Sequence, residues 1–285
     1  MAAGMRLSRR LIILGISLVG FVVLLRVAVG PLNGAAPIYP DGPIPPLDLA
    51  AIREGAPVPR RFLAHMPPDF HTLEVQDGLK GRFLSIVLPL VLAENEALGE
   101  RRARIAGLLD KRAAGASLTV REQDILNRAC AEFGVDEKEP EALLERIDQV
   151  PVSLALAQSI EESGWGRSNF TREGRALFGQ WTFDPDKGVR LIRRKSGLVF
   201  AVRKFDTLEA SVRAYMHNLN THRAYGVFRT RRAWLREKGE PLTGLALAET
   251  LKHYSERRGA YVAGLRGMIR LNRLDQFDGA QLINR

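Results

Sequence analysis

A long apolar run near the N-terminus has the length and the flanks of a membrane segment. It extends without a charge from Leu11 to Leu25 and, after Arg26, stays apolar as far as Gly30. Counted with Arg26, whose long side chain can reach the lipid headgroups, it approaches the roughly 20 residues that a spanning helix needs. The pattern predicts a signal-anchor over residues 1–30. A signal peptide cleaved after its last small residues is the alternative, which Arg26 beside the cleavage site disfavours.

The charges around this run predict its orientation. Arg9 and Arg10 precede it, whereas residues 27–52 include no Lys or Arg and carry Asp41 and Asp48. Basic flanks stay on the cytoplasmic side of a membrane. We therefore expect the bulk of the chain in the periplasm, held at the inner membrane, or exported if the signal is removed.

Prolines dominate the next stretch of the chain. Ten of the fifteen prolines lie between Pro31 and Pro68. Such a density favours an extended chain over a packed domain. We expect residues 31–75 to form a poorly packed linker that gives the remainder reach from the membrane.

Beyond the prolines, apolar positions recur with a helical period. Thr119 and Glu122 have the spacing of a capping box, and Gly134 is a suitable helix end. The predicted helical segments are 79–100 with an interruption at Pro89, 101–114, 119–134 and 141–149. Together they define a helical extension over residues 76–149.

In the second half of the chain, the spacing of the apolar positions changes from a helical pattern to a strand pattern, which predicts a small β-lobe. Residues 189–193 and 199–204 have the pattern of two strands, with Lys195-Ser196-Gly197 as the turn between them. The helical period resumes after Thr207, a suitable N-cap. The later helical segments are 231–238, 243–254 and 260–274. The sequence therefore predicts a mainly α fold with a small β-hairpin lobe, in a domain over residues 150–285.

The charge balance limits the expected partners. Lys and Arg number 42 against 32 Asp and Glu, a net charge of +10, but four of the arginines stand in the first thirty residues. The remaining excess forms no dense basic stripe, so nucleic acid is not an expected partner. It fits a protein beside an anionic lipid or polymer, and equally a basic surface kept for solubility.

No metal or cofactor is expected. The single cysteine, Cys130, excludes an internal disulfide and a cysteine-based zinc site. His217 and His222 are five residues apart, off one helical face, and no Asp or Glu stands between them. The sequence also has no HExxH motif, no Walker A motif and no GxGxxG motif between a strand and a helix, so the commonest cofactor-binding motifs are missing.

Two adjacent glutamates end an apolar helical segment. Residues 154–160 lead into Glu161 and Glu162, and Gly164 stops the helix. Successive helical residues differ by about 100°, so the two carboxyls face different surroundings. A buried carboxyl near the negative end of a helix has a raised pKa and can stay protonated as a general acid. A pair of surface glutamates fits these residues equally well.

Motifs around this segment carry a family resemblance. AQSIEESGWG at residues 157–166, then GRALFGQW at 174–181, resembles the glucosaminidase domain of glycoside hydrolase family 73, and more closely its Bax-type branch. Phe205-Asp206 and residues 211–222 continue the likeness, which spans 150–285. It implies a lysozyme-like helical fold and a peptidoglycan hydrolase that cleaves the β-1,4 bond after N-acetylglucosamine.

The same resemblance assigns candidate site residues. It places the catalytic acid on Glu162, and Tyr254 and Tyr261 match paired tyrosines near the family's end. Fourteen of the twenty aromatic residues follow residue 150, and their rings suit either a core or a cleft that stacks on sugars. The expected substrate contacts are Trp165, Phe178, Gln180, Trp181 and Tyr215.

One family feature is missing from the β-lobe. Members often carry a second carboxylate there, yet residues 195–202 hold no Asp or Glu. The nearest substitutes are Asp184, Asp186, Asp206 and Glu209. The substrate's own N-acetyl group could instead attack the anomeric carbon, with Tyr254 or Tyr261 orienting that group or a water. Two alternatives stay open: a lytic transglycosylase, which needs no second carboxylate, and an inactive, membrane-tethered glycan-binding protein.

Overall fold

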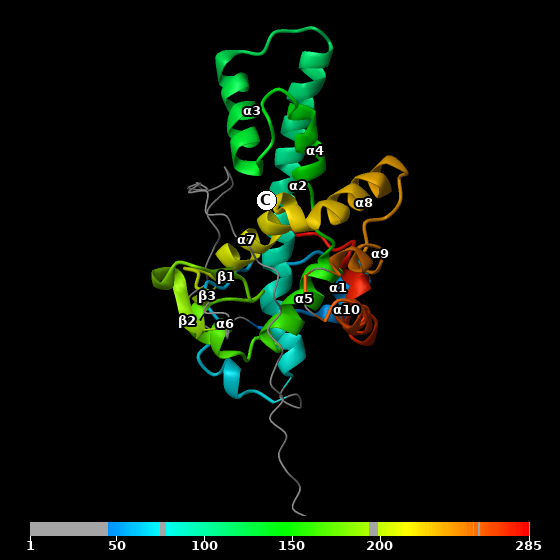
Figure 1. Ribbon diagram of the computed structural model, residues 1–285. Coiled ribbons are helices and arrows are strands. Elements are labelled where there is room, and N and C mark those ends of the chain that lie inside the picture. The colour runs from blue at the N-terminus through cyan, green and yellow to red at the C-terminus, as the bar shows by residue number, and fades with distance from the viewer. Residues whose placement is uncertain (1–44, 75–77, 194–198, 253, 256, 285) are drawn as a thin grey trace, which may run out of the picture.

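The computed structural model describes residues 45–74, 78–193, 199–252, 254–255 and 257–284 (Figure 1). The predicted membrane segment, the first part of the predicted linker and the hairpin turn lie outside these residues. Among the helices of the described ranges, none combines the length and the apolar character needed to cross a bilayer.

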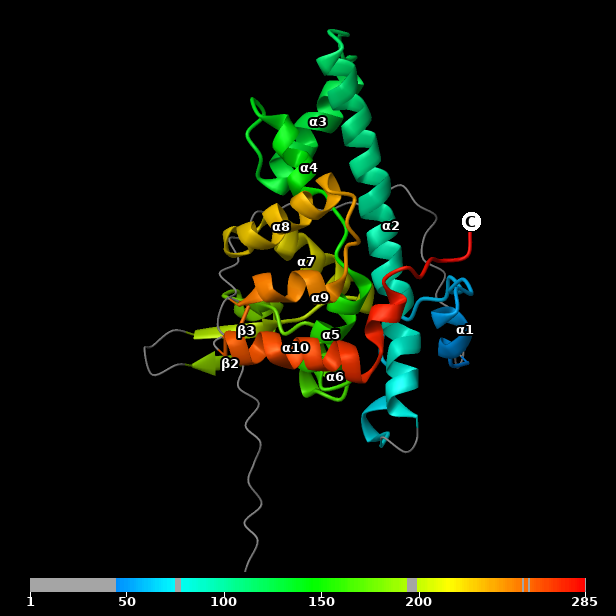
Figure 2. The same cartoon turned by 90° about the vertical axis from the view of Figure 1, so that its right-hand side faces the viewer.

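The longest element is α2 (Leu79–Ala113), a helix of 35 residues that runs along much of the height of the molecule (Figure 2). It passes through Pro89 without a break, so the predicted interruption there was wrong. Proline removes one helical hydrogen bond. Leu88 and Leu90 on either side are fully buried, and α2 packs against α5 and α7. Tertiary packing therefore holds the helix together across the proline.

Shorter helices surround this long one. They are α1 (Leu49–Arg53), α3 (Val120–Phe133), α4 (Leu143–Arg146), α5 (Val152–Ser163), α6 (Asn169–Gly174), α7 (Leu208–Thr221), α8 (Gly226–Glu237), α9 (Gly244–Leu247) and α10 (Gly259–Leu271). The 3-10 turns η5 (Arg223–Tyr225), η6 (Ala248–Leu251) and η7 (Leu274–Phe277) lie among them.

Several predicted helix ends are present, and others differ. Thr119 and Glu122 form the capping box of α3, and Gly134 ends that helix with φ 63°. The helix predicted over 141–149 is only the four residues of α4 after a 3-10 turn, because Ile147 leaves the helical region at ψ 88°. Likewise, the segment predicted over 243–254 divides into α9 and η6.

Three short antiparallel strands form the β-lobe. They are β1 (Trp181–Thr182), β2 (Gly188–Arg193) and β3 (Val199–Arg203), in the order β1-β3-β2. The predicted hairpin is present, and β1 is an additional strand. A separate small apolar cluster fills the lobe, and its buried members are Ala176, Trp181, Phe200, Val202 and Phe205. The predicted mainly α fold with a small β-lobe is confirmed.

The described part of the proline-rich stretch is packed, so the linker prediction was wrong for residues 45–74. Val58, Phe62 and Phe70 are buried in the main core. The amide of Val58 donates to the carbonyl of Gln281 at 2.8 Å, and the amide of Ile283 donates back to Val58 at 2.9 Å. Buried apolar side chains and backbone pairing with the C-terminal residues thus hold this segment in the fold.

The helical extension shares a core with the domain that follows it. One cluster of buried residues joins Leu84 and Val91 of α2 to Leu154 of α5 and Leu208 of α7. The predicted boundary at residues 149 and 150 therefore does not separate two hydrophobic cores. Residues 83–92 of α2 are buried on every side of the helix, so this stretch needs partners on several sides, and α5 and α7 supply them.

Candidate active site

Helix α5 lies in the interior of the fold, and both of its ends are held by hydrogen bonds (Figure 1). At its start, the amide and hydroxyl of Ser153 donate to the two carboxyl oxygens of Asp278 at 2.8 and 2.7 Å. At its end, Gly164 adopts φ 58°, and the Gly166 amide donates to the Ser163 hydroxyl at 2.8 Å. The last turn, which carries Glu161 and Glu162, is therefore fixed in place.

Glu162 has the environment of a proton donor. Its side chain is only partly exposed. Burial raises its pKa to about 7, with a further upward contribution from the charge of Glu161. The hydrogen bond from Tyr261 and the positive charge of Arg257 act in the opposite direction. At neutral pH a large fraction of Glu162 therefore carries a proton, as a general acid requires.

The two predicted tyrosines lie against this carboxyl. The Tyr261 hydroxyl donates to Glu162 Oε1 at 3.1 Å. The ring of Tyr254 stacks on the ring of Tyr261, with centroids 5.5 Å apart and planes within 6°. The Tyr254 hydroxyl donates to the Phe178 carbonyl at 3.3 Å. Burial raises the pKa of both phenols well above 10, so both remain neutral hydrogen-bond donors.

Sequence reasoning missed two polar residues that contact the tyrosine pair. Gln158 is fully buried, and its amide nitrogen donates to the Tyr261 hydroxyl at 2.9 Å. Tyr225 is buried, and its ring lies 5.9 Å from that of Tyr254. Burial raises its pKa, and the charge of Glu162 adds to this shift. Gln158 stands four residues before Glu162 on the same helical face, a spacing that could have identified it. For Tyr225, no spacing or motif in the sequence indicated that it lies near the site.

Three of the predicted substrate contacts are buried, which corrects that prediction. Phe178, Trp181 and Tyr215 are 2%, 6% and 0% exposed. Phe178 stacks on Tyr215 with ring centroids 3.8 Å apart, and Trp181 stacks on Phe200 at 4.1 Å. A ring that is almost fully buried offers no free face for stacking on a sugar. These residues therefore support the site from within the core.

The other two predicted contacts have different surroundings. Trp165 meets the start of α2, edge-on to Phe83 at 5.7 Å and with the Lys80 amine 5.2 Å from its ring. Gln180 is half-buried and directly follows Gly179. Its side-chain oxygen is buried and has no hydrogen-bond partner among the described residues. Both residues remain predicted substrate contacts.

Glu161 and the four candidates for a second carboxylate either pair with a basic residue or lie at the surface. Glu161 pairs with the guanidinium of Arg257, which also lies 5.5 Å from the Tyr261 ring centre. In the β-lobe, Asp184 pairs with Lys187 at 2.9 Å, while Asp186 is exposed. Glu209 pairs with Arg213, and Asp206 is exposed. The ion pairs of Glu161, Asp184 and Glu209 thus join them to basic residues.

The structure gives no metal-binding arrangement in the ranges it describes, where no group of three or more His, Cys, Asp or Glu could hold an ion. His217 contacts the Glu132 carbonyl at 3.2 Å, and the ring nitrogen of His222 accepts from the Ala224 amide.

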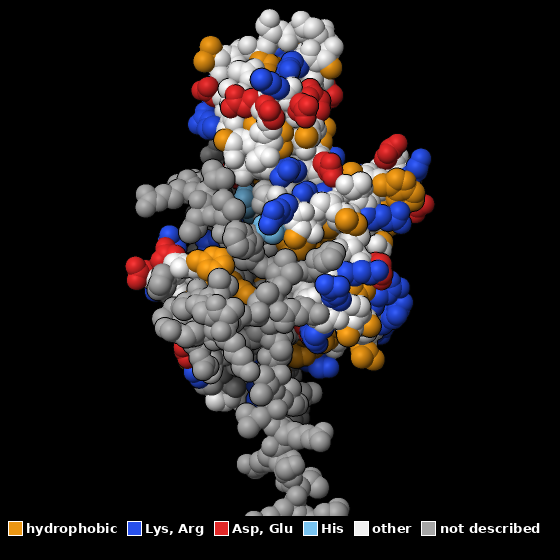
Figure 3. All heavy atoms as spheres, viewed as in Figure 1, with side chains coloured by type: hydrophobic (Ala, Val, Ile, Leu, Met, Phe, Trp, Pro, Cys, Tyr) orange, Lys and Arg blue, Asp and Glu red, His pale blue; other side chains and the backbone are white. Residues whose placement is uncertain are grey.

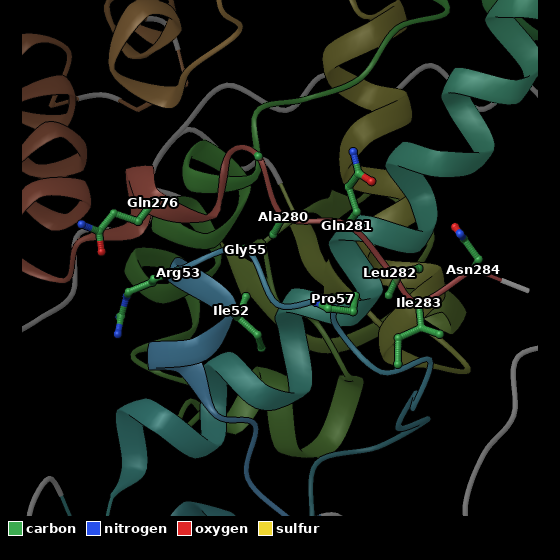
Figure 4. Close-up of a pocket in the computed structure, with 11 residues that line it drawn as sticks. Ile52, Arg53, Gly55, Pro57, Gln276, Ala280, Gln281, Leu282, Ile283 and Asn284 are labelled. Carbon is green, nitrogen blue, oxygen red and sulfur yellow. The ribbon is translucent and has the colours of Figure 1, made fainter.

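A pocket of about 500 Å³ opens between α1 and the C-terminal residues (Figure 4). Its lining includes Arg53, Pro57, Gln281 and Ile283 but no predicted site residue.

Gly179 brings the backbone close to the second carboxyl oxygen. It has φ +61°, and a Cβ atom there would lie 3.3 Å from Glu162 Oε2. We expect Gly179→Ala to lower kcat/KM at least tenfold, because the new methyl group crowds this oxygen, and to cost about 1 kcal/mol of stability from backbone strain.

The control for this change is Gly239→Ala. Gly239 has φ +66°, and a Cβ atom would meet nothing within 4 Å. Its replacement carries the same backbone cost without the contact, so we expect a similar loss of stability and unchanged turnover. Equal losses of activity in the two variants would mean that strain alone, and not contact with Glu162, explains the effect.

A carboxyl with a pKa near neutral at the end of a buried helix, with a phenol donating to it, is the kind of site that glycoside hydrolases use. Residues 141–273 match the glucosaminidase family, described as mannosyl-glycoprotein endo-beta-N-acetylglucosaminidase. The chain is also similar to Protein bax of Escherichia coli (strain K12), with 32% identity over 196 residues that cover 68% of this chain and 70% of that protein. The chain belongs to the Bax-type glucosaminidase-domain proteins.

A solved structure is also similar to this chain. It is the catalytic domain of the autolysin Auto from Listeria monocytogenes, with a TM-score of 0.35 and 21% sequence identity. The match covers 59% of this chain and 93% of the Listeria chain.

Proposed function

We propose that this protein hydrolyses the glycan strands of peptidoglycan at the β-1,4 bond after N-acetylglucosamine, with Glu162 as the general acid. The observation that carries the proposal is the raised pKa of Glu162, about 7, in a carboxyl that the family motif also selects. An unperturbed glutamic acid would be almost fully ionised at neutral pH. The glucosaminidase match supports the substrate class.

The first step of this mechanism is a proton transfer. Glu162 donates its proton to the glycosidic oxygen as the bond to the anomeric carbon breaks, and becomes a carboxylate. Because Glu161 is paired with Arg257, and the candidate second carboxylate Glu209 with Arg213, we assign the attack to the substrate's N-acetyl oxygen. Water then opens the cyclic intermediate and returns a proton to Glu162, so the enzyme is regenerated.

Product analysis separates this proposal from its alternatives. Purified peptidoglycan would be digested with the full chain, and the released fragments analysed by mass spectrometry. We expect N-acetylglucosamine at new reducing ends. Anhydro sugars would identify a lytic transglycosylase instead. Binding to peptidoglycan without soluble product would identify a glycan-binding protein, and either result would overturn the proposed hydrolysis.

The proposed subcellular localisation follows from the sequence and the proposed substrate. A signal-anchor over residues 1–30 would hold the protein at the inner membrane, with residues from about 45 onward in the periplasm, where peptidoglycan lies. On the face shown in Figure 3, basic side chains gather around α8 to α10 and acidic ones over α3 and α4. A basic side of this kind favours contact with anionic envelope polymers. Protease accessibility in spheroplasts measures this orientation.

A further inference from the structure

Three buried side chains connect Glu162 to helix α7 through hydrogen bonds. The Tyr215 hydroxyl donates to Gln158 Oε1 at 2.6 Å. Gln158 Nε2 donates to the Tyr261 hydroxyl at 2.9 Å, and that hydroxyl donates to Glu162 Oε1 at 3.1 Å. Tyr215, Gln158 and Tyr261 are 0%, 0% and 1% exposed, so water does not compete for these bonds.

The Tyr215 hydroxyl fixes which group donates and which accepts in each of these bonds. In the reverse order Gln158 would donate to Tyr215, and the Tyr215 proton would need another acceptor. Among the described residues, the Tyr215 hydroxyl has no hydrogen-bond partner other than Gln158. A buried hydroxyl without an acceptor keeps the full cost of its desolvation, with no hydrogen bond to offset it. The Tyr215 proton therefore orients the Gln158 amide, and the amide orients Tyr261.

We infer that Gln158 and Tyr215 are positioning residues that direct the Tyr261 proton onto Glu162 Oε1 and thereby leave the transferable proton of Glu162 on Oε2. An oxygen that accepts a hydrogen bond from Tyr261 serves as the carbonyl oxygen of the protonated carboxyl. Oε2 is the oxygen beside Gly179, where the absence of a Cβ leaves room. The inference rests on the proposed role of Glu162 as general acid and assigns the atom that donates.

Tyr215 therefore acts on Glu162 without touching it. If Tyr215 became Phe, the Gln158 oxygen would lose its donor, and the amide could turn to accept from Tyr261. The Tyr261 proton would then leave Glu162, whose carboxylate would lose a stabilising hydrogen bond. The pKa of Glu162 would rise, because hydrogen bonds to the charged form lower a carboxyl pKa.

Other groups around Glu162 stay the same in this comparison. The charged ones that act on it are Glu161 on α5 and Arg257 before α10. Tyr225 and Tyr254 are neutral phenols whose pKa values are raised by burial and further by the charge of Glu162. The Tyr225 side chain bonds to Asn218 and is not part of the three-residue chain. Tyr225→Phe is therefore the matched control.

The test is an infrared titration of Glu162 in the full chain, with the carboxyl band identified by its loss in Glu162→Gln. We expect Tyr261→Phe and Tyr215→Phe each to raise the midpoint by about one pH unit, while Tyr225→Phe leaves it near the wild-type value. In Tyr215→Phe/Gln158→Met, Tyr261 has only Glu162 left as acceptor. This double variant also leaves no buried polar partner unpaired, and we expect its midpoint to return most of the way to wild type.

Two outcomes would overturn the inference. One is a wild-type midpoint in Tyr215→Phe while Tyr261→Phe is shifted, and the other is a double variant shifted as far as Tyr215→Phe alone. The titration needs no substrate, so it remains decisive if the protein cuts no glycan. Conversely, glycan hydrolysis with an unshifted Tyr215→Phe midpoint would reject the positioning role and leave the proposed function intact.

Discussion

Glu162→Gln is expected to lower the rate of glycan cleavage by a factor of about 10² to 10⁴ while the fold stays intact. Glutamine keeps the shape of the side chain and can still accept from Tyr261, but it has no proton to give to a leaving oxygen. Release of reducing ends from peptidoglycan measures the rate, and circular dichroism monitors the fold. Wild-type turnover in this variant would remove Glu162 from the mechanism.

Glu161→Gln is the matched control for that result. It changes the adjacent residue on the same last turn of α5, but its carboxyl pairs with Arg257 instead of joining the tyrosines. We expect activity within about tenfold of wild type. Its removal also takes away a negative charge that raises the pKa of Glu162, so the alkaline limit of activity should move to slightly lower pH.

The raised pKa of Glu162 also predicts a pH dependence of stability. The folded pKa is about 7, against a usual value of 4.5, so between these values the folded state holds a proton that the unfolded state has released. Stability therefore falls as the pH rises through this window, by up to about 3 kcal/mol in total. Glu162→Gln lacks this group and should not show this part of the decline.

Urea denaturation at two pH values measures the effect. At pH 4 the variant and the wild type should have nearly equal free energies of unfolding, because the carboxyl is mostly protonated in both the folded and the unfolded state. At pH 8 we expect the variant to be the more stable. Glu94 and Asp278 also have raised pKa values, but they titrate equally in both proteins and cancel in the difference. A difference independent of pH would contradict the assignment.

Local signals in the sequence correctly predicted several elements. The capping box of α3, the hairpin of β2 and β3, and the helix end at Gly164 each depend on residues within a few positions of one another. Pro89 and the proline-rich residues 45–74 were predicted wrongly for a common reason. In both cases buried apolar neighbours supply packing that outweighs a local preference of proline.

The candidate site was predictable only in part. Glu162 followed from the helix pattern together with the family motif, and the tyrosine pair from the motif alone. The burial of Phe178, Trp181 and Tyr215 was not predictable, because an aromatic residue has the same sequence signal in a core and in a cleft. Gln158 was visible as part of the motif, but its partners were not.

The sequence by itself determined a mainly α protein with a small β-lobe and one acidic residue at the end of an apolar helix, since these follow from periodicity and short-range chemistry. Only the tertiary structure decided what surrounds that residue. The partners of Gln158 are Tyr215 and Tyr261, 57 and 103 positions away along the chain. Folding brings these side chains together in the interior, away from water. There, burial leaves each of these hydrogen bonds with one donor and one acceptor.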